Sequence, residues 1–365
     1  MKIECVREKL VAAIARAEKI TGKNLSLPVL SCVFLEAKGA SLIIRATNLD
    51  LGIELSLPTK VEREGVVAVP GSILSSFVSQ LQGKNVTLES NEGNLLVSTE
   101  ANSTVIKCMI HDDFPSIPQV TDGKSFSLNA KDFVKGLKAV WYSSSTSSMK
   151  PELSSVYIYP DGESVMFVAT DSFRLAEKRV QVKKAKDFQQ ILIPFKNVPE
   201  IIRVLEDSNE EIEIKLNKNQ ISFSQPSLYL TSRVVDGAFP DYKQIIPKEF
   251  KTEAVVLKQD LVAALKLANL FSDAFKQVNF KLDPSAKLFQ IKTRNSDVGE
   301  NSSRVDAALS GEPIEINYNW KYITDCFQSI DSDSIALHFT AHNRPMIMKG
   351  ISDNSFTYLV MPMNK

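Results

Sequence analysis

The sequence has few of the residues that carry redox, metal or nucleophilic chemistry. Its 365 residues include three histidines and four cysteines, and no Cys-x-x-Cys pair occurs. His338 and His342 are four residues apart, but they lie in a strand-like run without an acidic partner pattern, so they do not indicate a zinc site. We therefore expect no metal and no cofactor. Scattered thiols are typical of reduced, buried residues in a cytosolic protein; they are Cys5, Cys32, Cys108 and Cys326.

Long hydrophobic runs and net charge are also lacking. No stretch approaches the ~20 uninterrupted apolar residues of a transmembrane helix. The first ten residues carry five charges, which does not fit the apolar core of a signal peptide. The 43 basic and 43 acidic residues cancel, so a field that attracts a polyanion must come from segregation of charge over the surface. These features predict a cytoplasmic protein.

No complete catalytic motif occurs. Gly123-Lys124-Ser125 resembles the end of a phosphate-binding loop, but Pro118 stands where that loop needs glycine, and a strand-like run follows. No serine has the setting of a hydrolase nucleophile. Asp161, Glu163 and Asp171 leave open a metal-dependent nuclease, although Asp161 lies in a Pro-Asp-Gly turn signal, where aspartate is expected for local hydrogen bonding. The sequence favours a protein that is not an enzyme.

What the sequence does have is repetition. Four landmarks recur in the same order, at intervals of about one small domain. They are Leu10-Val11-x-x-Ile14, Phe133-Val134-x-x-Leu137 and Leu261-Val262-x-x-Leu265; Ala46-Thr47-Asn48, Ala169-Thr170-Asp171 and Lys292-Thr293-Arg294-Asn295; Val69-Pro70, Ile193-Pro194 and Tyr318-Asn319; and Phe114-Pro115 with Phe239-Pro240. The length suits three domains of ordinary size. We place them at residues 1–120, 121–248 and 249–365, with linkers at Pro118–Lys124 and Pro247–Thr252.

Each copy predicts the order strand, helix, strands, helix, strands. Apolar residues recur at helical spacing over 7–20 and 131–141, and they alternate with polar residues over 211–216 and 334–339. The fold class is therefore α+β, with antiparallel sheet backed by two helices in each copy. The polar run Ser143–Ser148 is interpreted as a mobile loop.

The first predicted helix of every copy carries cations opposite its apolar stripe. These are Arg7, Lys9, Arg16 and Lys19; Lys131, Lys135 and Lys138; and Lys258 and Lys266. Composition alone favours a solvated helix face. The functional interpretation is a surface that faces phosphates without reading bases, which gives salt-sensitive, sequence-independent binding. Balanced net charge fits a protein that surrounds DNA and slides along it.

Three segments carry a family resemblance. Ala169–Ala176, Val235–Tyr242 and Tyr358–Met363 resemble the bacterial sliding clamps, the beta subunits of the DNA polymerase III holoenzyme. The resemblance spans the whole chain in length, triplication and C-terminal sequence. It implies three DNA-clamp domains in each chain and a head-to-tail homodimer that forms a ring around duplex DNA. It also implies a processivity factor without enzymatic activity, which depends on an ATP-driven loader for opening.

The resemblance implies contacts within the ring. The contact between two copies maps onto Phe77 and Ile106 in the first copy and Leu270 and Phe271 in the third. Positions expected to face double-stranded DNA are Lys23, Asn24, Lys131, Lys135, Lys138, Lys150, Lys196, Lys258 and Lys266.

A peptide-binding cleft between the second and third copies is the other implied site. In this family the replicative polymerase catalytic subunit, other polymerases, the clamp loader, mismatch-repair proteins and ligase dock short linear motifs there. The cleft maps onto Leu153, Thr170, Ser172, Phe173, Arg174, Leu175, Pro240, Gln244, Ile245, Asn343, Pro345, Leu359, Val360, Met361, Pro362 and Met363. Methionines can repack around different apolar side chains, which suits a surface with many partners. We expect Met361–Met363 to be exposed to a partner.

The sequence departs from the family pattern in places. Ser172-Phe173 replaces a common Gly-His pair, which loses a hydrogen-bond donor and restricts the backbone. Gly22-Lys23-Asn24 keeps one cation in a loop that often offers arginine to DNA, and Phe195 replaces an expected basic residue. Two alternatives stay open: a peptide-binding repeat scaffold that never encircles DNA, and a nuclease that uses Asp171.

Overall fold

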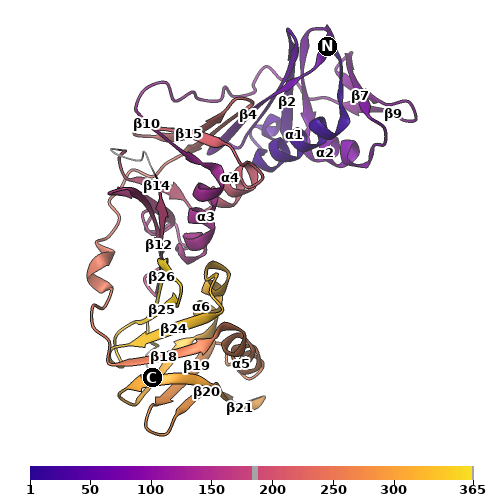
Figure 1. Cartoon of the computed structure of the whole chain (residues 1–365). Helices are drawn as coiled ribbons and strands as arrows, with labels where there is room; N and C mark the ends of the chain where they lie inside the picture. The colour runs from indigo at the N-terminus through magenta and orange to yellow at the C-terminus, as the bar shows by residue number, and fades with distance from the viewer. Residues whose placement is uncertain (183–187, 364–365) are drawn as a thin grey trace. The chain divides into compact units, whose positions relative to one another are not determined.

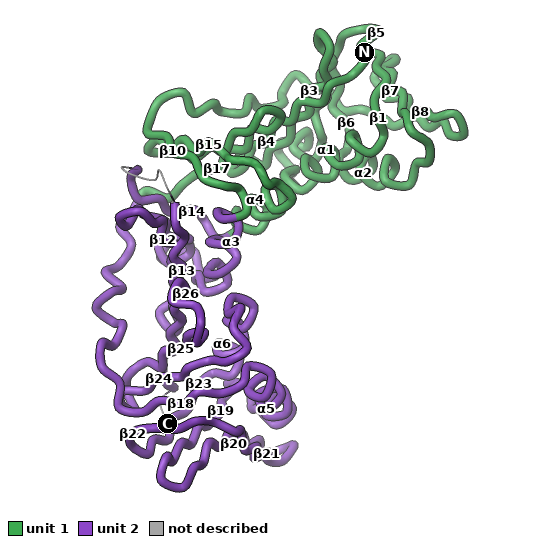
Figure 2. Tube along the Cα trace, viewed as in Figure 1, with its two compact units in different colours: residues 1–131, 196–236 green, residues 132–195, 237–365 purple. Residues whose placement is uncertain are grey.

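A computed structural model describes residues 1–182 and 188–363. The chain divides into two compact units, one of residues 1–131 and 196–236 and the other of residues 132–195 and 237–365 (Figure 2). Every strand pair of the described residues is antiparallel, which confirms the predicted α+β class. Among the same residues, no helix has the length and apolar character needed to cross a membrane.

The first unit contains two sheets. One has the order β5-β1-β7-β8-β9, and the other has the order β10-β15-β16-β17-β4-β3-β2-β6. The strands of the first sheet are β1 (Lys2–Val6), β5 (Lys60–Arg63), β7 (Asn85–Asn91), β8 (Asn94–Ser98) and β9 (Ser103–Lys107). Those of the second are β2 (Cys32–Lys38), β3 (Ser41–Thr47), β4 (Leu51–Pro58), β6 (Gly65–Pro70), β10 (Lys124–Asn129), β15 (Glu211–Leu216), β16 (Gln220–Gln225) and β17 (Leu228–Arg233).

The described residues of the second unit also form two sheets. They have the orders β14-β11-β12-β13-β26-β25-β24-β18-β22 and β21-β20-β19-β23. The first is built from β11 (Ser155–Asp161), β12 (Ser164–Thr170), β13 (Arg174–Gln181), β14 (Ile191–Pro194), β18 (Thr252–Leu257), β22 (Ala307–Gly311), β24 (Ser334–Phe339), β25 (Met346–Gly350) and β26 (Asp353–Val360). The second is built from β19 (Gln277–Asp283), β20 (Leu288–Asn295), β21 (Gly299–Arg304) and β23 (Ile314–Asn319).

Within the described residues each copy has two α-helices, as predicted. They are α1 (Arg7–Ile20) and α2 (Gly71–Gln80), α3 (Ala130–Val140) and α4 (Val198–Leu205), and α5 (Lys258–Leu270) and α6 (Trp320–Asp325). Helix α1 buries Leu10, Ile14 and Ala17 at helical spacing, and it lies against α2, β3 and β4 (Figure 1). In α3, a Cβ on Gly136 would lie 2.4 Å from the Phe167 ring, so glycine lets this helix approach β12 closely.

The copies are joined through equivalent strands. Strand β17 of the second copy pairs with β4 of the first, and β26 of the third pairs with β13 of the second. The register is the same at both junctions: Ser232 pairs with Leu51, and Val360 pairs with Arg174. Strand β9 of the first copy is the counterpart of β17 and β26, and β21 of the third copy is the counterpart of β4 and β13. Each of these two remaining strands lies at the edge of its sheet.

A turn conserved between copies follows β3 and β12. The Oδ1 atoms of Asn48 and Asp171 accept backbone N–H groups two and three residues ahead, at 2.8–3.0 Å. In the third copy Asn295 accepts the N–H of Asp297 at 2.9 Å. The third-copy counterpart of Thr47 and Thr170 is therefore Arg294, not Thr293 as the sequence landmark suggested.

One local prediction was wrong at its start. Ser143 lies in a 3-10 helix (Trp141–Ser143) and is buried with Ser144, so the serine run is not a loop from its first residue. Ser144 Oγ donates to the Ser155 carbonyl oxygen at 3.3 Å. This hydrogen bond satisfies the buried hydroxyl group, which the polar composition of the serine run would place in solvent. Strand β11 continues through Asp161, which pairs with Ser164 and is therefore the first residue of the predicted turn.

Candidate functional site

The predicted cleft has an apolar floor. Leu175 and Leu359 are paired across β13 and β26, and both side chains are buried. They form one cluster with Val168, Ile347 and Tyr242. Half-buried side chains pack against this cluster: Tyr157, Tyr159, Phe239, Ile246 and Met361. The floor can therefore accept apolar side chains without leaving polar groups unpaired.

A rigid turn presents an aromatic ring at one side of this floor. Thr170 Oγ1 donates to the Arg174 carbonyl oxygen at 2.7 Å, and Asp171 caps the turn as described above. Ser172 has φ 77°, in the left-handed region that disfavours a residue with Cβ. The turn leaves Phe173 60% exposed, stacked on Tyr322 with centroids 6.4 Å apart and planes at 21°.

Arg174 holds this aromatic wall in place. Its guanidinium donates to Asp171 at 3.0 Å, to Asp325, and to the Tyr142 carbonyl oxygen at 2.7 Å. It also lies 4.7 Å from the centre of the Tyr322 ring, within cation–π range. These bonds are internal to the chain, so Arg174 positions Tyr322 and the turn.

The other predicted cleft residues fall into three classes. Pro240, Gln244, Ile245 and Asn343 are exposed, whereas Leu153, Pro345 and Val360 are buried. Met361–Met363 are half-buried rather than exposed, because the N–H of Met361 donates to the Phe173 carbonyl oxygen and that of Met363 to the Asn317 carbonyl oxygen, both at 2.8 Å. Gln244 and Ile245 also line a cavity of about 860 Å³ with Ile246, Pro247, Thr340 and Arg344.

Sequence reasoning missed two aromatic residues of this region. Tyr322 lies on α6, far along the chain from Phe173, and no motif links them. In the sequence, Tyr242 is only the last residue of the Val235–Tyr242 segment that carries the family resemblance. Its hydroxyl donates to Glu177 and hydrogen-bonds with Tyr159 Oη at 2.8 Å. Burial, followed by the nearby Glu177 carboxylate, raises the pKa of Tyr242, so this phenol stays neutral.

The predicted DNA-facing cations differ in availability. Lys23, Lys131, Lys150 and Lys266 are exposed. Lys135 Nζ lies 3.2 Å from Asp331, and Lys196 Nζ lies 2.6 Å from Asp50, in ion pairs that remain open to solvent. Lys258 is half-buried, and its Nζ donates to the Ile330 carbonyl oxygen. Asn24 Oδ1 accepts two backbone N–H groups of its own loop. Lys258 is thus the least suited to reach a phosphate.

The predicted contact between copies is only partly exposed. Leu270 is 65% exposed, and Phe77 and Phe271 are half-buried. Ile106 is buried within its own unit, so its side chain belongs to the core. The neighbouring Val105 is 61% exposed on the opposite face of β9. Successive side chains of a strand point to opposite faces of the sheet, so Val105 faces outward because Ile106 faces the core.

The nuclease alternative lacks a metal site. Asp171 pairs with Arg174, and Asp161 Oδ2 lies 3.3 Å from Arg179. Over residues 1–182 and 188–363, no three histidine, cysteine or carboxylate side chains are grouped to hold a metal ion. Burial, followed by the Glu4 carboxylate, raises the pKa of the Cys5 thiol to about 12, which disfavours its thiolate form.

Comparison with known proteins covers the whole chain. The models of the DNA polymerase III beta subunit match its N-terminal domain to residues 1–118, its central domain to 127–241 and its C-terminal domain to 243–364. The chain belongs to the DNA polymerase III beta subunit family. It therefore has three clamp domains.

Individual relatives agree over full length. A beta sliding clamp of Synechococcus elongatus is 28% identical over 371 residues, covering 100% of this chain and 99% of the relative. One of Staphylococcus epidermidis is 25% identical over 373 residues, with the same coverage. The crystal structure of the Thermotoga maritima DNA polymerase III beta subunit has a TM-score of 0.94 and 25% identity, covering 100% of this chain and 99% of that one.

Proposed function

We propose that this chain is a cytoplasmic DNA sliding clamp: two copies close head to tail into a ring around duplex DNA and tether the replicative polymerase and other DNA-processing proteins. The domain boundaries that we propose are 1–120, 121–248 and 249–365. The function is mechanical, so it requires no catalytic group and no cofactor. Ring opening is left to a separate ATP-driven loader.

The single observation that carries the ring is the pair of matching edge strands. Strand β9 corresponds to β17 and β26, and β21 corresponds to β4 and β13. Since both internal junctions join one member of each set, β9 of one copy can join β21 of another in the same way. Such a head-to-tail contact can repeat until the ring closes.

The internal junctions also supply a register for this contact. Thr231 pairs with Gly52, and Leu359 pairs with Leu175. Val105 stands at the position of Thr231 and Leu359, and Glu300 at that of Gly52 and Leu175. The proposed register therefore pairs Val105 with Glu300 of the other copy, Thr104 with Asn301, and Ile106 with Gly299. Backbone bonding closes the ring, and Phe77, Leu270 and Phe271 add apolar contact.

Peptide binding at the junction of the second and third domains rests on its apolar floor. The first junction has different residues at the same positions: Arg45 for Val168, Gly52 for Leu175 and Thr231 for Leu359. A Cβ on Gly52 would lie 3.0 Å from Ile117 Cγ2, so Ile117 fills the space that Leu175 fills at the other junction. We propose that short apolar motifs of the polymerase, clamp loader, repair proteins and ligase bind only at the second junction.

Retention on DNA after loading tests the function. The chain, loaded by a cognate loader and ATP onto nicked circular DNA, should remain bound in high salt and leave when the circle is linearised. Salt weakens phosphate contacts but does not break a topological link. Equal retention on circular and linear DNA would indicate ordinary phosphate binding. Loader binding without retention on either DNA would favour the peptide-binding scaffold.

A further inference from the structure

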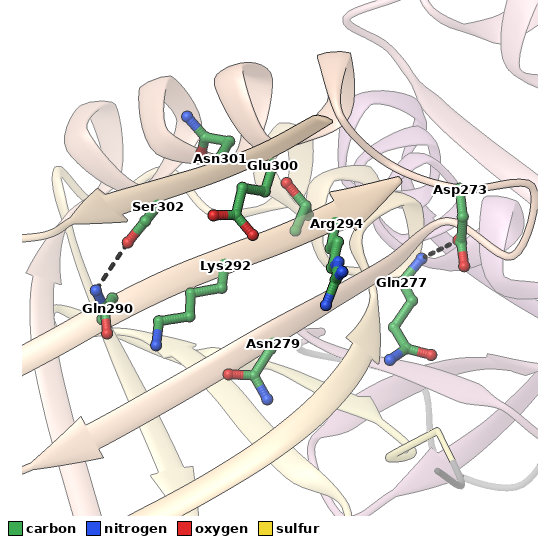
Figure 3. A pocket seen from close by; sticks show the side chains of 10 residues that line it. Asp273, Gln277, Asn279, Gln290, Lys292, Arg294, Glu300, Asn301 and Ser302 are labelled. Carbon is green, nitrogen blue, oxygen red and sulfur yellow. Dashed lines mark hydrogen bonds between the residues drawn. The ribbon is translucent and has the colours of Figure 1, made fainter. Parts of the chain in front are cut away.

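A polar pocket lies on the face of the sheet formed by β19, β20 and β21 (Figure 3). Its volume is about 490 Å³. Lys292 and Arg294 come from β20 and Glu300 from β21, and among the described residues none of the three takes part in an ion pair. The remaining lining residues are Asp273, Gln277, Asn279, Gln290, Thr293, Asn301 and Ser302.

This pocket is the counterpart of the peptide cleft at the third domain's free edge. Asn279 pairs with Lys292 as Tyr157 pairs with Val168. Arg294 pairs with Glu300 as Thr170 pairs with Leu175. The same positions therefore hold an aromatic and aliphatic surface at one junction and amide and charged groups here. A ligand of this face must be polar.

In the proposed ring, a second copy completes the pocket. In the register proposed above, Val105 of the partner subunit lies opposite Glu300, and Lys107 of the partner subunit lies diagonal to it on the same face, within reach of a long side chain. Lys107 is exposed and has no ion pair among the described residues. In the proposed closed ring its ammonium group faces Glu300, so Lys292, Arg294 and Lys107 of the partner subunit outnumber the carboxylates of Glu300 and Asp273.

We propose that the pocket binds an acidic peptide segment of a partner protein and selects the closed ring; this inference rests on the proposed function. Lys292 and Arg294 bind its carboxylates. The equivalence of this pocket to the peptide cleft of the second junction supports a peptide as the occupant. Asn279 also lines the pocket, and its Nδ2 donates to Asn317 Oδ1 at 2.9 Å.

The test is fluorescence anisotropy with a labelled octapeptide of alternating glutamate and glycine, using the full-length dimer. The Lys292→Ala/Arg294→Ala double variant should weaken binding about tenfold, because two charge-assisted contacts are lost. Lys281→Ala is the matched control: Lys281 lies on β19 of the same sheet, 3.9 Å from Glu315, and outside the pocket. Its substitution should leave the affinity within about twofold.

A double-mutant cycle tests the contribution of the second copy. Lys107→Ala should weaken peptide binding about threefold, and Glu300→Gln should restore it in the Lys107→Ala background, because the carboxylate that Lys107 offsets is then removed. Unchanged binding by the Lys292→Ala/Arg294→Ala variant would overturn the proposal. Equal binding of the glutamine–glycine octapeptide, or equally effective competition by inorganic phosphate, would overturn it too.

The oligomeric state separates this inference from the proposed function. Analytical ultracentrifugation of each variant reports whether the ring forms. A dimer that does not bind the acidic peptide contradicts the pocket alone. A chain that stays monomeric at all concentrations contradicts the ring itself, whatever the peptide does.

Discussion

Lys196 and Asp50 form an ion pair of 2.6 Å at the first junction, where the second junction has Phe173 stacked on Tyr322. The equivalence follows from backbone bonds: Arg233 donates to the Asp50 carbonyl oxygen as Met361 donates to that of Phe173. The first junction thus presents the charged pair Lys196–Asp50, whereas the second junction presents the aromatic pair Phe173–Tyr322. The two junctions share their backbone but differ in the ligands that they accept.

Phe173→Ala should weaken binding of the cognate polymerase subunit about tenfold, because an exposed ring that covers an apolar motif is lost. Surface plasmon resonance on the dimer measures this. Asp50→Ala, the equivalent change at the first junction, is the matched control and should leave polymerase binding unchanged. Similar losses in both variants would contradict a cleft confined to the second junction.

Ser172→Gly should raise the free energy of unfolding by about 0.5–1 kcal/mol, because glycine adopts the left-handed φ of 77° without a Cβ penalty. The control Ser125→Gly, in an exposed position of β10, should lower it, since glycine loses more entropy in an extended strand. Urea denaturation measures both. A lower stability for Ser172→Gly would mean that the serine side chain makes a compensating contact.

Acid should destabilise the pairing of β13 with β26 through Asp353. Lys178 Nζ donates to Asp353 at 3.0 Å and to Ser355 at 2.6 Å, and its side chain is only 3% exposed. Burial alone would raise the pKa of Asp353, but hydrogen bonds from Ser355 and Lys178 outweigh it and lower the pKa below 3.8. A carboxyl pKa that is lower in the folded state than in the unfolded state stabilises the fold at pH values above the unfolded-state pKa. This stability is lost as the pH falls through the folded-state pKa.

Urea unfolding at pH 7 and pH 3 tests this. Asp353→Asn should remove part of the loss between these pH values. Lys178→Ala should cost about 3 kcal/mol at pH 7, because it leaves a partly buried carboxylate without its cation. The same dependence on pH in the wild type and Asp353→Asn would assign acid sensitivity to other groups.

Replacing Lys131, Lys135 and Lys138 by alanine should weaken salt-sensitive DNA contact. Each lost phosphate contact lowers the slope of log affinity against log salt by about 0.9. Polymerase binding at the cleft should not change. Lys258→Ala should have less effect than Lys266→Ala, because the Lys258 ammonium is already bonded to the Ile330 carbonyl oxygen. Filter binding at several salt concentrations measures these slopes.

The repeated elements could be predicted from the sequence because their periodicity is local. Helix α1 spans residues 7–20 and β15 spans 211–216, as the apolar spacing indicated. The choice between Val105 and Ile106 as the outward residue required the pairing register, which no local pattern gives. Stacking of Phe173 on Tyr322 depends on two elements distant in sequence. Ser143 is buried despite its polar composition, because the helix α3 leads it into the core.

Cysteine cross-linking across the proposed contact tests the ring most directly. Thr104 and Asn301 fall at a position equivalent to the closely spaced, non-hydrogen-bonded pair of Leu230 and Ile53, where a disulfide fits. The Thr104→Cys/Asn301→Cys variant should give a covalent two-chain ring under mild oxidation. Thr104→Cys/Ser302→Cys should not, because its side chains lie on opposite faces. Cross-linking only in the second variant, or a ladder of longer chains, would contradict a closed two-copy ring.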